Sequence, residues 1–136
     1  MRIVIDSYAW IELFSGSLKG NKVKEVLESA DELYTPDIVL AEIARKYIRE
    51  GVKDSIVKTR LEQISANSHI TSLDSKLAFE SAKCYLELAE NARKNKLNLP
   101  SLFDAIILAT GRARNAKVLT GDLHFKSLPE TVWVNP

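Results

Sequence analysis

Cysteine and methionine are nearly absent from the 136-residue chain, which has one of each, and no long hydrophobic run occurs. A single cysteine, Cys84, excludes an intrachain disulfide and a zinc site built from several thiolates, and this fits a reducing cytosol. No stretch approaches the roughly 18 consecutive apolar residues of a membrane span. The apolar run at the N-terminus is too short for the core of a signal peptide. We therefore expect a cytoplasmic protein without a membrane span.

Net charge is also nearly absent, because 19 basic residues are balanced by 18 acidic ones. This balance argues against a nucleic-acid coat protein and against a binder of membrane surfaces, so a polyanion would need a local basic patch. With 46% hydrophobic and 27% charged residues, the composition is typical of a soluble globular protein. The length predicts a single domain, residues 1–136, which can bury a core without disulfides or structural metal.

Short apolar runs alternate with longer amphipathic ones along the chain. The apolar runs predict strands at 2–6, 32–35, 69–72, 117–120 and 131–134. The amphipathic runs predict helices at 8–14, 22–29, 36–50, 52–67, 74–95 and 102–114, the last of them apolar almost all round and therefore buried. The alternation predicts an α/β fold, a three-layer α/β/α sandwich with a mainly parallel five-stranded sheet and right-handed crossovers.

Four acidic residues occupy positions that such a sheet brings to one edge. All parallel strands end at this edge, where ligand sites form; Asp6 ends the first strand, and Asp122 lies two residues past the fourth. Helices that link parallel strands begin at the same edge. Glu42 therefore lies there, about one turn into its helix, and so does Asp104, in the first turn of the helix that Ser101 caps. The four carboxylates converge if the strand order places these elements side by side.

Each acid taken alone has a structural explanation. Asp104 has capping-box spacing from Ser101 and suits the helix dipole. Glu42 could face solvent, and the other two acids could be turn residues. Together, however, packed carboxylates repel one another and lose hydration unless a cation joins them. Oxygen ligands without His or Cys companions select Mg²⁺ or Mn²⁺ over zinc and leave positions for water and a substrate phosphate.

The segments around these acids resemble the four motifs of PIN-domain nucleases. They read DSYAWIE around Asp6, TPDIVLAEIARKY around Glu42, SLFDAIILATGRA around Asp104 and VLTGDLHF around Asp122. The length of the chain and the span of the match are similar to those of VapC-type toxins of toxin-antitoxin pairs. No single motif is specific, but the ordered set of four is.

The resemblance implies a metal-dependent endoribonuclease in which the first and fourth strands are adjacent. Asp6, Glu42, Asp104 and Asp122 match the four catalytic and metal-ligating positions of the family. The fourth position, that of Asp122, is the least uniform in the family. Ser7 and Thr120 match supporting positions that orient ligands or water through hydrogen bonds. One or two Mg²⁺ or Mn²⁺ ions would activate water and stabilise charge on the scissile phosphate, leaving a 5′-phosphate and a 3′-hydroxyl. An RNA substrate, a homodimer and an antitoxin partner are implied as well.

Other classes lack their sequence features. An aspartyl-phosphate phosphatase needs a second Asp at the position of Tyr8, and the chain has neither the dinucleotide nor the P-loop fingerprint. Three alternatives remain open: a non-cleaving PIN-like scaffold that binds RNA or protein, a solitary RNA-processing nuclease without an antitoxin, and a structural metal site. We expect His124 to make a surface hydrogen bond and Trp133 to lie in the core.

Overall fold

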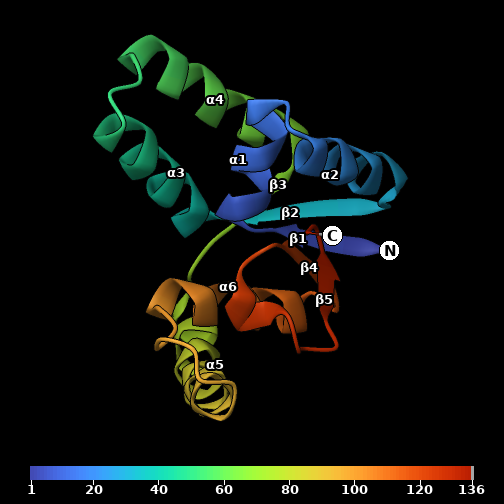
Figure 1. Cartoon of the computed structure of the whole chain (residues 1–136), viewed down its shortest axis with the longest axis vertical. Helices are drawn as coiled ribbons and strands as arrows, with labels where there is room; N and C mark the ends of the chain where they lie inside the picture. Colours follow the sequence, from blue (N-terminus) through green and yellow to red (C-terminus); the bar gives the residue numbers. More distant parts are fainter. Residues whose placement is uncertain (136) are drawn as a thin grey trace.

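The structure, a computed structural model that describes residues 1–135, is a three-layer α/β/α sandwich (Figure 1). Its sheet has five strands, all parallel, in the order β3-β2-β1-β4-β5. The strands are β1 (Arg2–Ile5), β2 (Glu32–Pro36), β3 (His69–Thr71), β4 (Lys117–Thr120) and β5 (Thr131–Trp133). The predicted fold class is confirmed, and the last residue of the predicted domain, Pro136, lies outside the described residues.

Helices cover both faces of the sheet (Figure 1). One side carries α1 (Ser7–Ser15), α2 (Leu18–Ser29), α3 (Asp37–Arg49) and α4 (Asp54–Asn67), and the other carries α5 (Ser75–Lys94) and α6 (Leu102–Ala113). Compared with the prediction, α2 begins four residues earlier and α4 two residues later. A short 3-10 helix, η1 (Leu123–Phe125), follows β4 and was not predicted.

The connecting helices lie on opposite faces of the two halves of the sheet, which meet where β1 lies beside β4. The connections β1 to β2 and β2 to β3 carry α1 to α4 on one face, and the connection β3 to β4 carries α5 and α6 on the opposite face. At the reversal β1 and β4 pair directly, with Val4 opposite Val118 and Ile5 opposite Leu119. The implied adjacency of the first and fourth strands is confirmed. Open α/β sheets bind ligands beyond the carboxyl ends of the strands at such a reversal.

The helix α6 forms the centre of the core on its side of the sheet. It packs on β1, β2 and β4 with one side and on α5 with the other, and residues 105–111 are all buried, as its apolar sequence predicted. The sequence of α5 predicts a buried face made of Leu77, Ala78, Ala82, Tyr85, Leu86 and Ala89. This prediction is partly wrong: Ala89 is buried, but Leu86 is 70% exposed, and Ser81 and Leu88 are buried instead. The sequence of α5 has apolar residues on two stripes, and contact with α6 selects between them.

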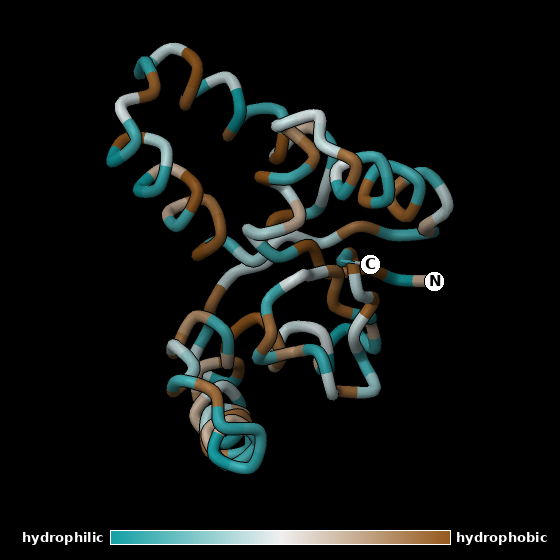
Figure 2. Tube along the Cα trace, viewed as in Figure 1, coloured by the Kyte–Doolittle hydropathy of each residue, from teal (hydrophilic) through white to brown (hydrophobic). Residues whose placement is uncertain are grey.

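Amphipathic helices complete the outer layers. Figure 2 shows hydrophilic and hydrophobic stretches alternating along α2, which buries Val23. No helix within residues 1–135 is both long and apolar enough to cross a membrane.

Candidate functional site

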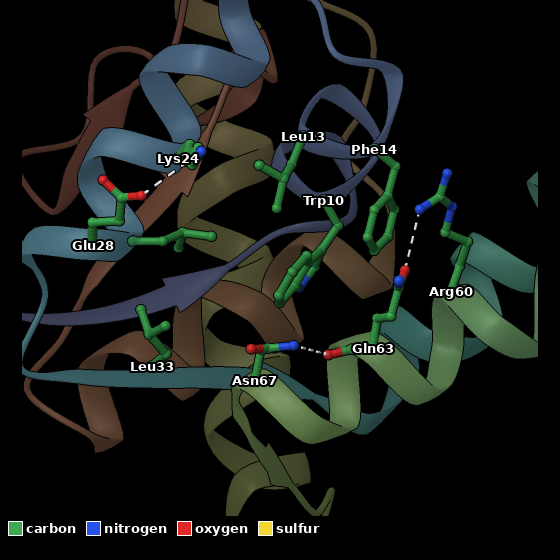
Figure 3. Close-up of a pocket in the computed structure, with 10 residues that line it drawn as sticks. Trp10, Leu13, Phe14, Lys24, Glu28, Leu33, Arg60, Gln63 and Asn67 are labelled. Carbon is green, nitrogen blue, oxygen red and sulfur yellow. Dashed lines mark hydrogen bonds and ion pairs between the residues drawn. The ribbon is translucent and has the colours of Figure 1, made fainter.

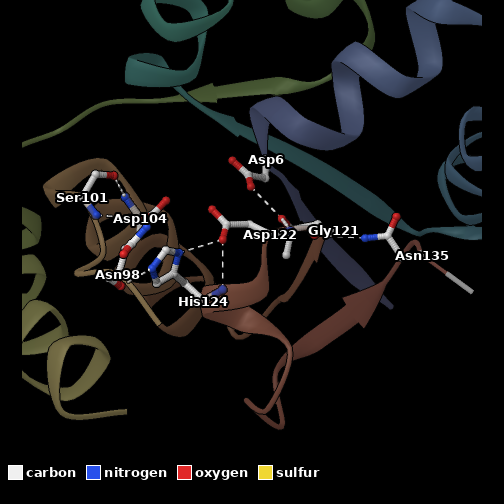
Figure 4. Close-up of polar contacts among 9 residues, drawn as sticks. Asp6, Asn98, Ser101, Asp104, Gly121, Asp122, His124 and Asn135 are labelled. Carbon is white, nitrogen blue, oxygen red and sulfur yellow. Dashed lines mark hydrogen bonds and ion pairs between the residues drawn. The ribbon is translucent and has the colours of Figure 1, made fainter. Parts of the chain in front are cut away.

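A cavity of about 310 Å³ lies at the carboxyl edge of the sheet, beside the β1–β4 junction. Figure 4 shows Asp6, Asp104 and Asp122 pointing toward a shared space from the end of β1, from α6 and from the loop after β4. The cavity is lined by all four acids identified from the sequence and by Ser7, together with Tyr8, Ile11, Glu12 and Lys46. The tertiary structure thus brings the four carboxylates to one place.

Asp6 is the most buried of these acids, with 4% of its surface exposed. It follows β1 directly and caps α1, because its Oδ1 accepts a hydrogen bond from the backbone N–H of Ser7 at 2.7 Å. Its Oδ2 accepts a hydrogen bond of 2.7 Å from Oγ1 of Thr120. Burial raises the pKa of Asp6 to about 7; the Thr120 bond opposes this, while the charges of Asp104 and Asp122 add to it. The carboxyl is therefore about half protonated at neutral pH, and a bound cation would shift it to the ionised form.

Thr120 connects two of the acids. The hydroxyl that donates to Asp6 also accepts a hydrogen bond of 3.0 Å from the backbone N–H of Asp122, and Thr120 itself is fully buried at the end of β4. Ser7, at the start of α1, holds the other oxygen of Asp6 through its N–H, with its hydroxyl 3.4 Å from the same oxygen. Both residues make the kind of contact expected of groups that orient a carboxylate.

Glu42 projects from α3 into the cavity, so the alternative that it faces solvent is wrong. Its Oε1 is buried and has no hydrogen-bond partner. Burial, followed by the charges of Asp6 and Asp104, raises the pKa of Glu42 to about 8. A buried carboxylate oxygen without a donor is costly, and a cation in the cavity would offset that cost.

Asp104 has both of the roles considered for it. It forms a capping box with Ser101, in which Oδ2 accepts from the Ser101 N–H at 2.9 Å and the Ser101 hydroxyl accepts from the Asp104 N–H at 3.1 Å. The same side chain also lines the cavity. Burial raises the pKa of Asp104; the Ser101 bond opposes this, and the charge of Asp122 adds to it. The capping box thus fixes the acid at the cavity wall.

Asp122 and His124 form a pair after β4 (Figure 4). Oδ1 of Asp122 accepts a hydrogen bond from the backbone N–H of His124 at 2.9 Å and lies 2.8 Å from its Nδ1. The Nε2 atom lies 2.7 Å from the carbonyl oxygen of Asn98. Burial lowers the pKa of His124, but the hydrogen bonds to Asn98 and Asp122 outweigh it and raise that pKa above the usual value. The expected hydrogen bond of His124 exists, and one of its partners, Asp122, lines the cavity.

Lys46 lines the cavity and was missed by the sequence analysis. It lies one helical turn after Glu42, and this spacing could have identified it as a neighbour on the same face of α3. Its Nζ lies 3.0 Å from Oε2 of Glu50, so the ammonium is paired with a residue outside the cavity lining. Tyr8 was also missed as a wall residue; its ring packs against Gly121.

The donor set of the cavity suits a hard divalent cation. The acids supply only oxygen ligands, and Asp104, Asp122 and His124 place potential ligand atoms within 4.8 Å of one another. The oxygen of Glu42 has no partner, and burial, with the neighbouring acids adding to it, raises the pKa values of Asp6 and Glu42. A cation in the cavity would favour the ionised forms of these groups. The residues present therefore fit Mg²⁺ or Mn²⁺.

The chain matches the PIN domain family over residues 3–130, and it therefore belongs to that family. Its fold is similar to that of VapC20 from Mycobacterium tuberculosis, a sarcin-ricin loop cleaving toxin, with a TM-score of 0.74 and 19% identity over 98% of this chain and 99% of that one. It is also similar to VapBC2 from Rickettsia felis bound to a DNA fragment from its promoter, with a TM-score of 0.70 and 17% identity over 98% and 97%.

A toxin-antitoxin complex from Klebsiella pneumoniae has a TM-score of 0.67 and 20% identity, with 98% of both chains covered. At these identities the structural similarity concerns the fold. No curated protein matches the chain significantly in sequence.

Proposed function

We propose that this PIN domain is a metal-dependent endoribonuclease and the toxin of a toxin-antitoxin pair. The observation that carries the proposal is the convergence of Asp6, Glu42, Asp104 and Asp122 on one cavity at the topological switch of the sheet. In this proposal the four acids hold one or two Mg²⁺ or Mn²⁺ ions. Membership of the PIN-domain family and the similarity to VapC20 support it.

The residues of the chain shape and hold the site. Thr120 and Ser7 fix the orientation of the Asp6 carboxylate, and the Ser101 capping box fixes Asp104. A bound divalent ion supplies positive charge that offsets the carboxylates and attracts a phosphodiester. Lys46, which lines the cavity, can contact a phosphate oxygen of the substrate. Hydrolysis adds water across the P–O3′ bond and leaves a 5′-phosphate and a 3′-hydroxyl.

The proposal is tested by cleavage of structured RNA in Mn²⁺, in EDTA and with the Asp104→Asn variant. We expect cleavage in Mn²⁺ and none in EDTA. The Asp104→Asn variant should lose at least about 100-fold in cleavage rate, because loss of a group that only holds a metal ligand already costs up to about 100-fold. Asp74→Asn is the matched control, because Asp74 also caps a helix, lies outside the cavity lining, and Asn is an equally good cap. This control should cleave like the wild type.

Two outcomes would reject the nuclease. RNA binding that EDTA does not change, without product in any lane, favours the non-cleaving scaffold. A large increase in melting temperature with Mn²⁺, again without product, favours a structural metal site. Cleavage by a protein whose neighbouring reading frame encodes no antitoxin would instead favour a solitary RNA-processing nuclease.

A groove between α1, α2 and α4 supports the antitoxin part of the proposal (Figure 3). It has a volume of about 450 Å³, with Trp10, Leu13 and Phe14 on one wall and Lys24 and Arg60 among its polar residues. We propose that it receives an apolar segment of the antitoxin, because similar folds occur in VapBC assemblies. Co-purification with the product of the adjacent reading frame tests this.

The exposed Phe79 and Leu86 on α5 support the proposed homodimer, which light scattering tests.

A further inference from the structure

The acidic cavity contains little positive charge of its own with which to attract an RNA strand. Among residues 1–135, five of those that line it are acidic, the four acids of the site and Glu12, and one is basic, Lys46, which is also paired with Glu50. The chain has a formal net charge of +1, so it exerts no general attraction on a polyanion. Proteins hold single strands of RNA to a large extent through the phosphates. We therefore looked for cations directly beside the cavity.

Lys19 is placed beside the cavity by Tyr8, a residue of its wall. The Nζ atom of Lys19 donates a hydrogen bond of 3.2 Å to the hydroxyl of Tyr8. That hydroxyl donates in turn to Oδ1 of Asn135 at 3.1 Å, which fixes the polar end of the ring. Lys19 forms no ion pair with a carboxylate among residues 1–135. Because an ammonium has three hydrogens, Lys19 can still donate to an anion.

The start of α2 fixes the backbone of Lys19 relative to the cavity. Ser17 caps this helix by accepting from the N–H of Gly20 at 3.0 Å, and its hydroxyl lies 2.6 Å from Oε2 of Glu12, to which it donates. Gly20 approaches α1 so closely that a Cβ atom there would lie 2.3 Å from the carbonyl oxygen of Glu12. Since Glu12 lines the cavity, the turn between α1 and α2 ties Lys19 to the cavity wall.

Arg45 lies beside the cavity on α3. It follows Glu42 by three residues, so the two side chains are neighbours on the surface of the helix. Burial raises the pKa of Glu42, and the charge of Arg45 opposes that rise, in agreement with this placement. Arg45 is exposed and forms no ion pair with a carboxylate among residues 1–135. Its charge is therefore available to an anion as well.

The two cations lie on different sides of the acids. Figure 1 shows α1 between α3, which carries Arg45, and α2, which carries Lys19, and α1 contacts both helices. Tyr8, the partner of Lys19, contacts Gly121 after β4 and Asn135 after β5, whereas α3 follows β2 on the other side of β1. A strand of RNA that extends from Arg45 to Lys19 therefore passes over the end of β1 and its acid.

We propose that Lys19 and Arg45 hold the RNA strand across the cavity by binding phosphates on either side of the scissile one. This role rests on the proposed function, since it concerns the RNA substrate of the same site. Lys19 and Arg45 act in substrate binding, and neither takes part in metal binding or in the chemical step.

The test measures binding of a single-stranded RNA by fluorescence anisotropy at several salt concentrations. It is carried out in Mn²⁺ with Asp104→Asn as the parent protein, so that the RNA is not consumed. One phosphate contact to a single strand contributes about 0.7 to the slope of log K against log salt concentration. Lys19→Gln and Arg45→Gln should each reduce the slope by about this amount, which at about 0.1 M salt is about fivefold weaker binding. The double variant should lose about twice as much slope, because the two contacts are separate.

Two variants serve as controls. Lys19→Arg keeps the positive charge and should keep the slope. Lys117→Gln removes one positive charge at the amino end of β4, the opposite edge of the sheet, and should leave the slope unchanged. An unchanged slope in either Lys19→Gln or Arg45→Gln would overturn the inference. An equal loss in Lys117→Gln would also overturn it, because the attraction would then come from net charge alone.

Cleavage kinetics in the otherwise wild-type protein separate binding from chemistry. Lys19→Gln and Arg45→Gln should raise KM and leave kcat nearly unchanged, as does the loss of contacts that are equal in the ground state and the transition state. A lower kcat with an unchanged KM would place these residues in the chemical step and reject the binding role. If the wild type binds RNA without cutting it, the nuclease fails while the salt slopes still decide on the two contacts, so the two failures are distinguishable.

Discussion

At the scale of single residues, the hydroxyl of Thr120 links two acids of the site. Its hydroxyl donates to Asp6 and accepts from the Asp122 backbone, and it is fully buried. The sequence resemblance marked this position but gave no partner for the hydroxyl. The partners depend on the pairing of β1 with β4, which places residues that are more than 100 positions apart next to each other.

Thr120→Val should lower the free energy of unfolding by about 1–3 kcal/mol, because it leaves a buried acceptor on Asp6 and the N–H of Asp122 without a partner. Val has nearly the same shape, so the loss is not one of packing. Urea unfolding in EDTA at pH 5.5 and pH 8 measures the change. Thr120→Ser keeps the hydroxyl and should therefore keep most of the stability that Thr120→Val loses. Equal stability of Thr120→Val and the wild type would contradict the role of the hydroxyl.

Residue by residue, the acids were predictable because each lies at a definite position relative to a strand end or a helix start. Lys46 and the contacts of His124 with Asp122 and Asn98 were not predicted. The position of a side chain at a cavity wall depends on rotamers and on neighbours from other elements. For His124, the second partner is a backbone carbonyl in a loop that carries no sequence signal.

At the scale of elements, the turn between β4 and η1 packs closely against α1. A Cβ atom added at Gly121 would lie 2.4 Å from Cε1 of Tyr8 and 2.7 Å from Nδ2 of Asn135. This close approach keeps Asp122 beside Asp6. Only a residue without a side chain fits between the turn and the ring.

Gly121→Ala should therefore destabilise the protein by about 1–3 kcal/mol, as overpacking does. The double variant Gly121→Ala/Tyr8→Ala should lose less stability than the sum of the two single variants, because removal of the ring makes room for the new methyl group. Thermal unfolding of all four proteins measures the coupling. Additive losses would show that the Tyr8 ring does not limit the turn.

The elements themselves were largely predictable from periodicity and capping residues. Ser101 and Asp74 marked the starts of α6 and α5, and the uniformly apolar sequence of α6 predicted its burial. The buried face of α5 was predicted only in part, since its apolar residues lie on more than one side of the helix. η1 was missed because three residues are too few to show a helical period.

At the scale of the whole molecule, the gathered carboxylates couple stability to pH. The pKa values of Asp6 and Glu42, about 7 and about 8 in the folded protein, lie well above the ordinary values of 3.8 and 4.5. Between pH 4 and pH 8 the folded state therefore keeps protons that the unfolded state has released. As pH rises, the free energy of unfolding decreases wherever the folded state binds more protons than the unfolded state.

In EDTA, the melting temperature should therefore fall as pH rises from 5 to 8. Mn²⁺ should reduce or reverse this fall, because it binds the ionised form of the folded site and stabilises it by mass action. Scanning calorimetry across this range measures both curves. An Asp6→Asn/Glu42→Gln variant should show a flatter curve in EDTA and a smaller response to Mn²⁺. A wild-type melting temperature that rises with pH in EDTA would contradict the raised pKa values.

The sequence by itself determined the fold class, the number of strands and the identity of the acids. These features depend on local periodicity, on capping residues and on the rule that parallel strands end at one edge of a sheet. The ordered set of motifs added the pairing of the first and fourth strands, which the sheet of this protein contains.

Only the tertiary structure decided how the site is held together. The hydrogen bond from Thr120 to Asp6, the contact of His124 with Asn98 and the partnerless oxygen of Glu42 all join or isolate atoms from distant parts of the chain. Long-range contacts of this kind depend on the distances at which whole elements pack. Periodicity along one chain carries no information about those distances, whereas burial and charge in the folded protein follow directly from them.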